Sequence, residues 1–149
     1  MDKTTIIYLE KNNQYLMLHR NKKENDLNKD KWIGVGGHVE ENETIDECII
    51  REVKEETNLE LLDFRLCGEV TFDIDGYLEI MYVYTSTSFK GEIKECNEGT
   101  LEWVDKDKIN LLNIWEGDKI IFEKMISNKY FKLNMIYLND KLISYNEYN

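Results

Sequence analysis

The stretch of sequence that decides the fold is Gly36–Leu61, GGHVEENETIDECIIREVKEETNLEL. It predicts a helix from about Thr44 to Thr57, because Thr44 is a favourable N-cap and Glu47 follows three residues later, as in a capping box. The paired glycines before the helix allow another part of the backbone to approach closely. The segment therefore predicts a tight glycine turn that leads into a well-capped helix.

Three carboxylates of this helix lie close to its apolar side. At about 100° per residue, Glu55 lies about 60° to one side of Glu52, and Glu56 lies about 40° to the other. Ile49 and Val53, at about +60° and +100°, overlap the side that carries Glu56. Like charges one turn apart destabilise a helix. A hard divalent cation such as Mg²⁺, completed by water and substrate phosphates, would neutralise them; the alternative is a solvated acidic face.

Working outward, the remaining elements alternate irregularly along the chain. Strands are expected at Thr4–Glu10, Gln14–His19, Trp32–Val35, Leu61–Asp73, Tyr77–Ser86 and Leu101–Val104, a second helix at Asp118–Asn128, and a final hairpin from Lys129–Leu138 and Lys141–Tyr148. Asp75-Gly76 is a strong hairpin signal. The polar segments Arg20–Lys31 and Phe89–Gly99 are expected to be loops. This order predicts an α+β fold with a mixed sheet, and it leaves the strand order open.

Composition narrows the function classes. The chain has 149 residues, which predicts a single domain over 1–149, and it carries 19 basic against 30 acidic residues, a net charge of −11. Such an acidic surface argues against a nucleic-acid polymer as partner. A small anionic substrate stays possible if a cation lies beside it. No apolar run is long enough to span a membrane, and the N-terminus does not resemble a signal peptide, so we expect a cytoplasmic protein with no membrane partner.

The three cysteines, Cys48, Cys67 and Cys96, are odd in number and form no C-x-x-C pair. This pattern argues against a disulfide framework and against a zinc knuckle. Free thiols in a reducing compartment are expected.

The spacing of the central stretch resembles a family motif. Gly37 is followed after five residues by Glu43 and after seven more by Arg51–Leu59, REVKEETNL. This resembles the Nudix box, G-x5-E-x7-R-E-U-x-E-E-x-G-U, where U is bulky and apolar. The only departure is Asn58 in place of the last glycine, and Asn is the next most favourable residue for a left-handed helix end. The surrounding strand order is similar to the Nudix α/β/α sandwich, which is the fold the resemblance implies.

The resemblance implies an enzyme that cleaves a pyrophosphate bond in a nucleoside diphosphate linked to another group, using Mg²⁺ or Mn²⁺. The implied metal ligands are the three box glutamates and one carbonyl: Glu52, Glu55, Glu56 and Gly37. Arg51 would orient a box glutamate through a charge-assisted bond, unless it only forms a surface pair with Glu47 or Glu55. Glu43 would support the start of the helix.

A carboxylate must also accept the proton of the attacking water. In the family this base is a box glutamate or a glutamate from a later loop, and MutT-type members have a metal-linked glutamate in a place similar to Glu98. Glu98 is therefore the candidate base and a further metal ligand, with Glu102 as competitor. The alternative is that Glu98 is a solvated loop acid.

Two further segments point to the substrate. Trp32–Val39 is similar to the W-x-G-x-G-G-x-V run of enzymes that sanitise oxidised purine nucleotides, and Asn113–Asp118 resembles their W-P-D-D loop. The resemblance implies that Trp115 stacks near the base and that Asp118 hydrogen-bonds its edge. Glu116, Gly117 and Ile33 depart from the pattern, the last replacing a base-contacting asparagine, so base recognition or the substrate must differ. The alternatives are that Trp115 is a core aromatic and that Asp118 is an N-cap.

Other candidates carry weaker signals. Trp32 is a candidate substrate contact, with packing under the sheet as the alternative, and Arg20 is a candidate phosphate contact. Periodicity alone does not tell which aromatic residues of the strands line a pocket: Tyr8, Phe72 and Tyr82. The two histidines, His19 and His38, are expected to be ordinary hydrogen-bonded residues.

The sequence thus favours a metal-dependent nucleoside triphosphate pyrophosphohydrolase that acts on a small oxidised purine nucleotide such as 8-oxo-dGTP and is a monomer or homodimer. The alternatives are a Nudix hydrolase of a nucleotide sugar, a dinucleoside polyphosphate or a capped RNA end, and a Nudix module that binds a nucleotide without cleaving it. Retention of Glu52, Glu55 and Glu56 disfavours the non-catalytic module.

Overall fold

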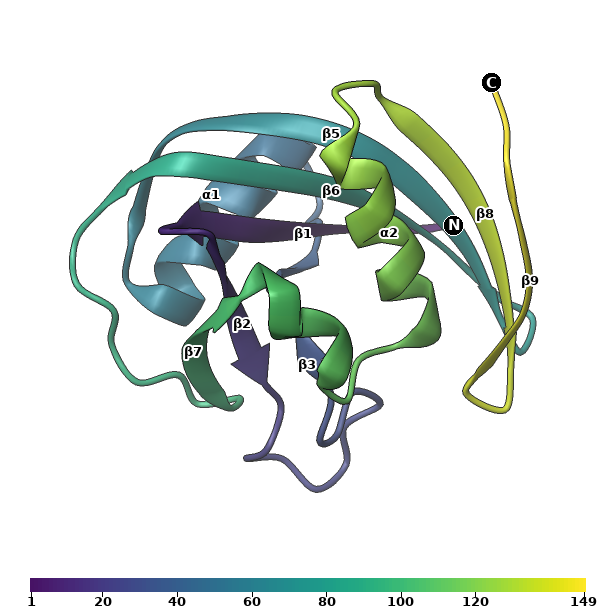
Figure 1. Ribbon diagram of the computed structural model, residues 1–149, viewed down its shortest axis with the longest axis horizontal. Coiled ribbons are helices and arrows are strands. Elements are labelled where there is room, and N and C mark those ends of the chain that lie inside the picture. Colours follow the sequence, from purple (N-terminus) through teal and green to yellow (C-terminus); the bar gives the residue numbers. More distant parts are fainter.

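The computed structural model describes residues 1–149 and contains nine strands, two α-helices and one 3-10 helix (Figure 1). In chain order they are β1 (Asp2–Lys11), β2 (Gln14–His19), β3 (Trp32–Ile33), β4 (Val35–His38), α1 (Ile45–Thr57), β5 (Glu60–Ile74), β6 (Tyr77–Lys90), β7 (Thr100–Asp105), η1 (Lys106–Leu111), α2 (Glu116–Ile126), β8 (Phe131–Leu138) and β9 (Lys141–Glu147). The mix of elements is the α+β class that the sequence predicts.

The strands form one mixed sheet around β1. The order is β3-β2-β1-β6-β5-β8-β9, with β4 paired to β1 and β7 paired to β2. The β1/β6 and β5/β8 pairs are parallel and the other pairs are antiparallel. Six consecutive residues of β1, Thr4–Leu9, are buried, as expected for a strand covered on both faces.

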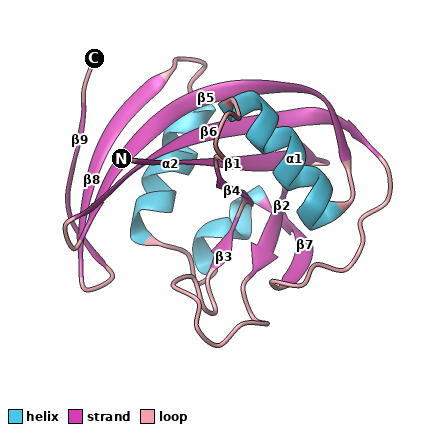
Figure 2. Ribbon diagram, turned by 180° about the vertical axis from the view of Figure 1, so that it is seen from behind, coloured by secondary structure: helices cyan, strands magenta, loops and turns pink.

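The two α-helices cover opposite faces of the sheet: α2 lies in front in Figure 1, and α1 lies in front in Figure 2, which is seen from behind. Alternate residues of β1 point to the two faces. Tyr8 packs in the larger core beneath α2, and Ile7 packs in the smaller core beneath α1 with Ile49 and Val53. Neither helix is long and apolar enough to cross a bilayer.

Helix α1 has the ends that its sequence predicts. Thr44 is the N-cap, its hydroxyl accepts from the Glu47 amide at 3.1 Å, and the Glu47 carboxylate accepts from the Thr44 amide at 2.9 Å. Asn58 ends the helix in the left-handed conformation, with φ of 70°, and its amide donates to the Lys54 carbonyl. Asparagine thus provides the helix exit for which the motif uses glycine.

Part of the predicted layout is wrong around the paired glycines. Trp32–Val35 is not one strand: β3 pairs with β2, whereas β4 pairs with β1. The change of partner occurs at Gly34, where a Cβ would lie 2.8 Å from the Ile7 carbonyl oxygen. Because this crossover depends on contacts between distant segments, strand propensity did not indicate it.

The second half also differs from expectation. Helix α2 begins at Glu116 rather than Asp118 and ends at Ile126, and its N-cap is Trp115. The N-cap interpretation of Asp118 is therefore wrong: the residue lies within the first turn, and it is buried. η1 was not predicted, β6 continues through Lys90, and β8 begins at Phe131.

Candidate active site

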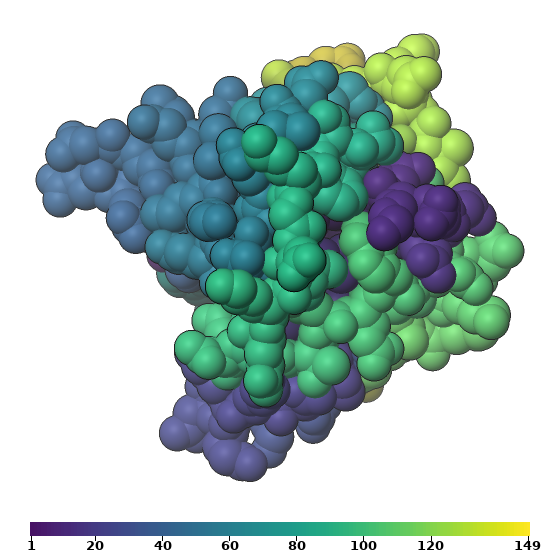
Figure 3. Space-filling model, turned by 90° about the vertical axis from the view of Figure 1, so that its left-hand side faces the viewer, coloured from purple at the N-terminus to yellow at the C-terminus, as the bar shows by residue number.

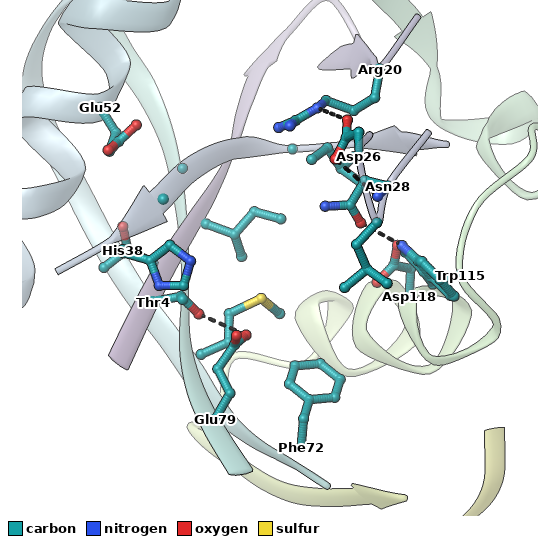
Figure 4. A pocket seen from close by; sticks show the side chains of 18 of the residues that line it. Thr4, Arg20, Asp26, Asn28, His38, Glu52, Phe72, Glu79, Trp115 and Asp118 are labelled. Carbon is teal, nitrogen blue, oxygen red and sulfur yellow. Dashed lines mark hydrogen bonds and ion pairs between the residues drawn. The ribbon is translucent and has the colours of Figure 1, made fainter. Parts of the chain in front are cut away.

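A cavity of about 630 Å³ extends from the glutamates of α1 to the start of α2 (Figure 4). Its volume lies within the range of small-molecule sites. Glu52 and Glu56 line it at the α1 end, and Trp115 and Asp118 line it at the α2 end. The β1 and β4 strands form the wall between them, with the loop between β2 and β3 on one side.

The three predicted glutamates of α1 do not share one environment. The Glu52 side chain is 13% exposed, and Glu56 is half-buried with a carboxylate oxygen that accepts from the Gly36 amide at 3.1 Å. The Glu55 side chain is 58% exposed and is not part of the cavity wall. The cavity therefore receives two of the three carboxylates.

The paired glycines let β4 run close to two neighbours at once. A Cβ on Gly36 would lie 1.9 Å from the Thr5 carbonyl oxygen of β1, and a Cβ on Gly37 would lie 2.5 Å from a carboxylate oxygen of Glu52. Both positions therefore require glycine, the first for the sheet and the second for the glutamate.

Gly36→Ala and Gly37→Ala are expected to separate stability from activity. Gly36→Ala meets backbone and should lower the free energy of unfolding by roughly 1–3 kcal/mol. Gly37→Ala meets only the mobile end of Glu52, so it should displace that carboxylate and lower kcat with a smaller loss of stability. Urea unfolding and steady-state kinetics on both variants check this. A Gly37→Ala variant that kept full activity would contradict it.

Arg51 holds the outer side of the site. Its guanidinium donates to both carboxylate oxygens of Glu43 at 2.7 and 3.0 Å, to Glu52 at 2.8 Å and to Glu55 at 3.2 Å. It also donates to the His38 carbonyl at 3.1 Å. The hydrogen bonds from Arg51 lower the pKa of Glu43 to about 2. Arg51 thus fixes the orientation of Glu52 and is more than a partner in a surface pair.

Glu98 reaches the cavity from the loop between β6 and β7, which runs along the side of the molecule shown in Figure 3. Hydrogen bonds tie this loop at both ends. The side-chain NH2 group of Asn58 donates to the Glu92 carbonyl at 3.1 Å, and the Lys22 ammonium donates to the Cys96 carbonyl at 2.8 Å. Glu102, the competing candidate, is exposed on β7 and lies outside the cavity.

Glu98 and Glu56 form a coupled pair. Burial, followed by the hydrogen bond to Glu98 and its negative charge, raises the pKa of Glu56 to about 9. Burial opposes ionisation of Glu98, yet the hydrogen bond from Glu56 and the charges of Arg20 and Lys23 hold its pKa below the ordinary value. Burial also raises the pKa of Glu52. At neutral pH Glu56 therefore holds the proton of the pair, and Glu98 is the ionised member.

Arg20 is a cation at the cavity wall, where it would lie beside an anionic substrate of this acidic protein. It lines the cavity and donates to Glu98 at 3.2 Å and to Asp26 at 2.8 Å. Its side chain is 14% exposed, so the charge is held near the carboxylates rather than in solvent. A phosphate in this part of the cavity would meet Arg20 directly.

The α2 end is partly apolar and carries one buried acid. The Trp115 ring lies edge-on to Tyr137, with centroids 5.8 Å apart, and the Lys31 ammonium lies 4.6 Å from its centroid on a face. Asp118 is 8% exposed, and burial raises its pKa to about 7. Trp115 packs against the core and also lines the cavity, so its position is that of a core aromatic, and its stacking on a base stays a prediction.

Comparison with known proteins identifies the family of the chain. A profile described as NUDIX domain matches residues 2–125. The chain belongs to the Nudix family. The Nudix box thus supplies Gly37, Glu52 and Glu56 to the cavity wall. It also supplies Glu43 and Arg51, of which Arg51 bonds to Glu52.

Relatives with printed functions are similar over part or most of the Nudix chain. An oxidized purine nucleoside triphosphate hydrolase of Danio rerio is 33% identical over 103 residues, which are 68% of this chain and 66%, just under two thirds, of that protein. An 8-oxo-dGTP diphosphatase of Buchnera aphidicola is 28% identical over 127 residues, 85% of this chain and 93% of that protein. The crystal structure of a MutT protein from Bacillus halodurans has a TM-score of 0.87 and 28% identity, covering 99% and 97% of the two chains.

The donors of the Nudix box suit a hard divalent cation in their chemistry. No three His, Cys, Asp or Glu side chains form a complete ligand cluster. However, Mg²⁺ is commonly held by one or two carboxylates together with water and substrate phosphates. Burial and the neighbouring carboxylates Glu98 and Glu52 raise the pKa of Glu56, and a bound cation would favour the ionised form that they disfavour. The residues therefore fit a cation that the substrate helps to bind.

Several other predicted positions lie elsewhere. Trp32 is not part of the cavity wall, and its ring stacks on His19 with centroids 4.4 Å apart. Tyr8 is buried in the core and Tyr82 packs at the α1 face, whereas Phe72 and His38 line the cavity. The cavity is also lined by polar residues that no sequence motif indicates, among them Asn28, Glu79 and Thr4. They come from segments whose pattern says nothing of which side faces a cavity.

Proposed function

We propose that this Nudix protein is a metal-dependent pyrophosphohydrolase that converts a nucleoside triphosphate with an oxidised purine base, such as 8-oxo-dGTP, to the monophosphate and pyrophosphate. The observation that carries the proposal is the single cavity that joins Glu52 and Glu56 to Trp115 and Asp118. One end is suited to phosphates and the other to a planar base. The names of the relatives support the same substrate class.

Glu52, Glu56 and the Gly37 carbonyl would hold Mg²⁺ or Mn²⁺ at the phosphate end. When bound, the cation would neutralise phosphate charge and lower the pKa of a nearby water. Arg51 keeps Glu52 in place through a 2.8 Å bond, and Glu55 would act at most from the outer side. Arg20 would bind a phosphate oxygen, since its guanidinium already lies at the cavity wall.

Glu98 is the proposed general base. Its pKa is lower than that of Glu56, so it is the ionised member of the pair and can accept a proton from water. Arg20 and Lys23, at 3.2 and 3.5 Å, keep it ionised. At the other end the Trp115 ring would contact the base face, and Asp118 would hydrogen-bond the base edge.

The test is a substrate panel with Mg²⁺: 8-oxo-dGTP, dGTP, other nucleoside triphosphates, ADP-ribose, a nucleotide sugar and a dinucleoside polyphosphate. We expect release of pyrophosphate from 8-oxo-dGTP with kcat/KM at least about 10-fold above dGTP, and no turnover with excess EDTA. Cleavage of only a non-triphosphate substrate, without pyrophosphate, would retain Nudix chemistry and refute the proposed substrate. Turnover that survived EDTA would refute the metal requirement.

A further inference from the structure

Asn28 lies at the base end of the cavity and belongs to none of the motifs. It comes from the loop between β2 and β3, lines the cavity beside Trp115, and is half-buried. Figure 4 shows its side chain between Trp115 and the open part of the cavity. Its position raises the question of what its amide does there.

The orientation of the Asn28 amide follows from its partner. The indole nitrogen of Trp115 donates a hydrogen bond of 2.8 Å to Asn28. An indole N–H can only donate, so the contacted atom is the carbonyl oxygen Oδ1. The NH2 group then faces the other way, and Figure 4 shows it directed into the cavity. It makes no hydrogen bond within the protein.

The backbone of Asn28 is also held. Its amide donates to Asp26 at 3.0 Å, and the same Asp26 carboxylate accepts from Arg20 at 2.8 Å. The Asp26 side chain is 7% exposed, so this link is shielded from water. The NH2 donor is therefore positioned before any substrate binds, which reduces the entropy lost on binding.

The side chains near the Asn28 NH2 group offer few other hydrogen-bond donors to a bound base. The indole N–H of Trp115 is already used, and the side chain of Ile33, which also lines the cavity, has no polar atom. Asp118 supplies the acceptor at this end of the cavity. A donor beside an acceptor complements the edge of an oxidised purine, which presents ring carbonyls next to ring N–H groups.

We propose that Asn28 is a specificity-determining residue whose NH2 group donates to a ring carbonyl oxygen of the purine. This rests on the proposed function, because it assumes a purine nucleotide in the cavity. Trp115 would then serve the base twice, through its ring and through the bond that orients Asn28.

The test is Asn28→Asp, which keeps an acceptor for Trp115 and removes the NH2 donor. The matched control is Asn25→Asp, the same change in the same loop at an exposed position outside the cavity. With 8-oxo-dGTP we expect Asn28→Asp to lower kcat/KM roughly 10- to 100-fold relative to Asn25→Asp, mainly through KM. Thermal unfolding of both variants shows that the fold is retained.

The substrate series identifies the contacted atom. With 2-aminopurine deoxyriboside triphosphate, which has no ring carbonyl, the two variants should differ by less than about 3-fold. With dGTP, a large difference assigns the contact to the 6-carbonyl, and a small one assigns it to the 8-carbonyl of the oxidised base. Trp115→Phe, which keeps a ring and loses the N–H, should show a weaker form of the same carbonyl dependence.

Two results would overturn the inference while leaving the proposed function intact: equal kinetics of the Asn28→Asp and Asn25→Asp variants on 8-oxo-dGTP, or an equal penalty on all three nucleotides. Failure of the proposed function would appear in the unmutated protein, as absence of turnover on every purine triphosphate, and would remove the inference with it.

Discussion

Glu56→Gln is expected to lower kcat on the best nucleotide about 1,000-fold while leaving the melting temperature unchanged or raising it. The catalytic loss follows because Glu56 lines the cavity and is a proposed ligand of the cation. The stability gain follows because burial and neighbouring charges raise the pKa of Glu56 to about 9, so folding at neutral pH requires this carboxyl to take up a proton. A glutamine of the same shape is neutral without that proton and can still accept from the Gly36 amide.

Steady-state kinetics and thermal unfolding of two further variants complete this test. Glu123→Gln changes an exposed glutamate of the other helix and should alter neither property. Glu55→Gln should lower kcat less than about 10-fold, because its side chain is 58% exposed outside the cavity. Equal losses for Glu55→Gln and Glu56→Gln would show that the cation recruits all three glutamates and rearranges α1.

Asp118→Asn is expected to reduce the loss of stability that accompanies rising pH between about pH 4 and pH 8. Burial raises the pKa of Asp118 from 3.8 to about 7, so the folded state retains a proton that the unfolded state has lost. A raised carboxyl pKa contributes stability at low pH that disappears as the pH rises through the folded value. The wild type should therefore lose about 2–4 kcal/mol relative to Asp118→Asn over this interval.

Urea unfolding of the protein without nucleotide, at half-unit steps of pH, measures this difference. Asp107→Asn, an exposed aspartate of η1, is the matched control and should follow the wild type at every pH. Parallel curves for the wild type and Asp118→Asn would show that the Asp118 carboxyl is hydrated through the cavity. The loss of stability would then have to come from other groups.

Local chemistry accounts for the parts of the fold that the sequence predicts correctly. The start of α1 depends on Thr44 and Glu47, which are three residues apart, and its end depends on the conformation of Asn58 alone. The hairpin at Asp75-Gly76 and the turn between β8 and β9 likewise depend on adjacent residues. Such features need no knowledge of distant contacts.

Helix geometry could have predicted that the box glutamates differ in exposure. Glu56, at about +40° from Glu52, lies next to the apolar stripe of Ile49 and Val53, and Glu55, at about −60°, lies farther from it. In the structure Glu56 is half-buried and Glu55 is exposed. The three carboxylates therefore differ in exposure although they lie within about 100° of one another.

The sequence could not predict which side chains line the α2 end of the cavity. Trp32 and Trp115 both occur in segments that resemble nucleotide-sanitising enzymes, yet only Trp115 lines the cavity, because Trp32 lies on β3 and stacks on His19. Asn28 sits in a polar loop with no pattern at all. Its position arises from bonds to Trp115, 87 residues away, and to Asp26.

By itself, the sequence determined the family motif, the capped helix that presents its glutamates and the excess of acid that requires a cation, since these depend on spacing and local hydrogen bonds. Only the tertiary structure decided that Glu98 rather than Glu102 joins the glutamates of α1 at the cavity, and which side chains line its other end. Those outcomes depend on loops folded against distant strands. Contacts between residues far apart in the chain leave no periodic trace in it.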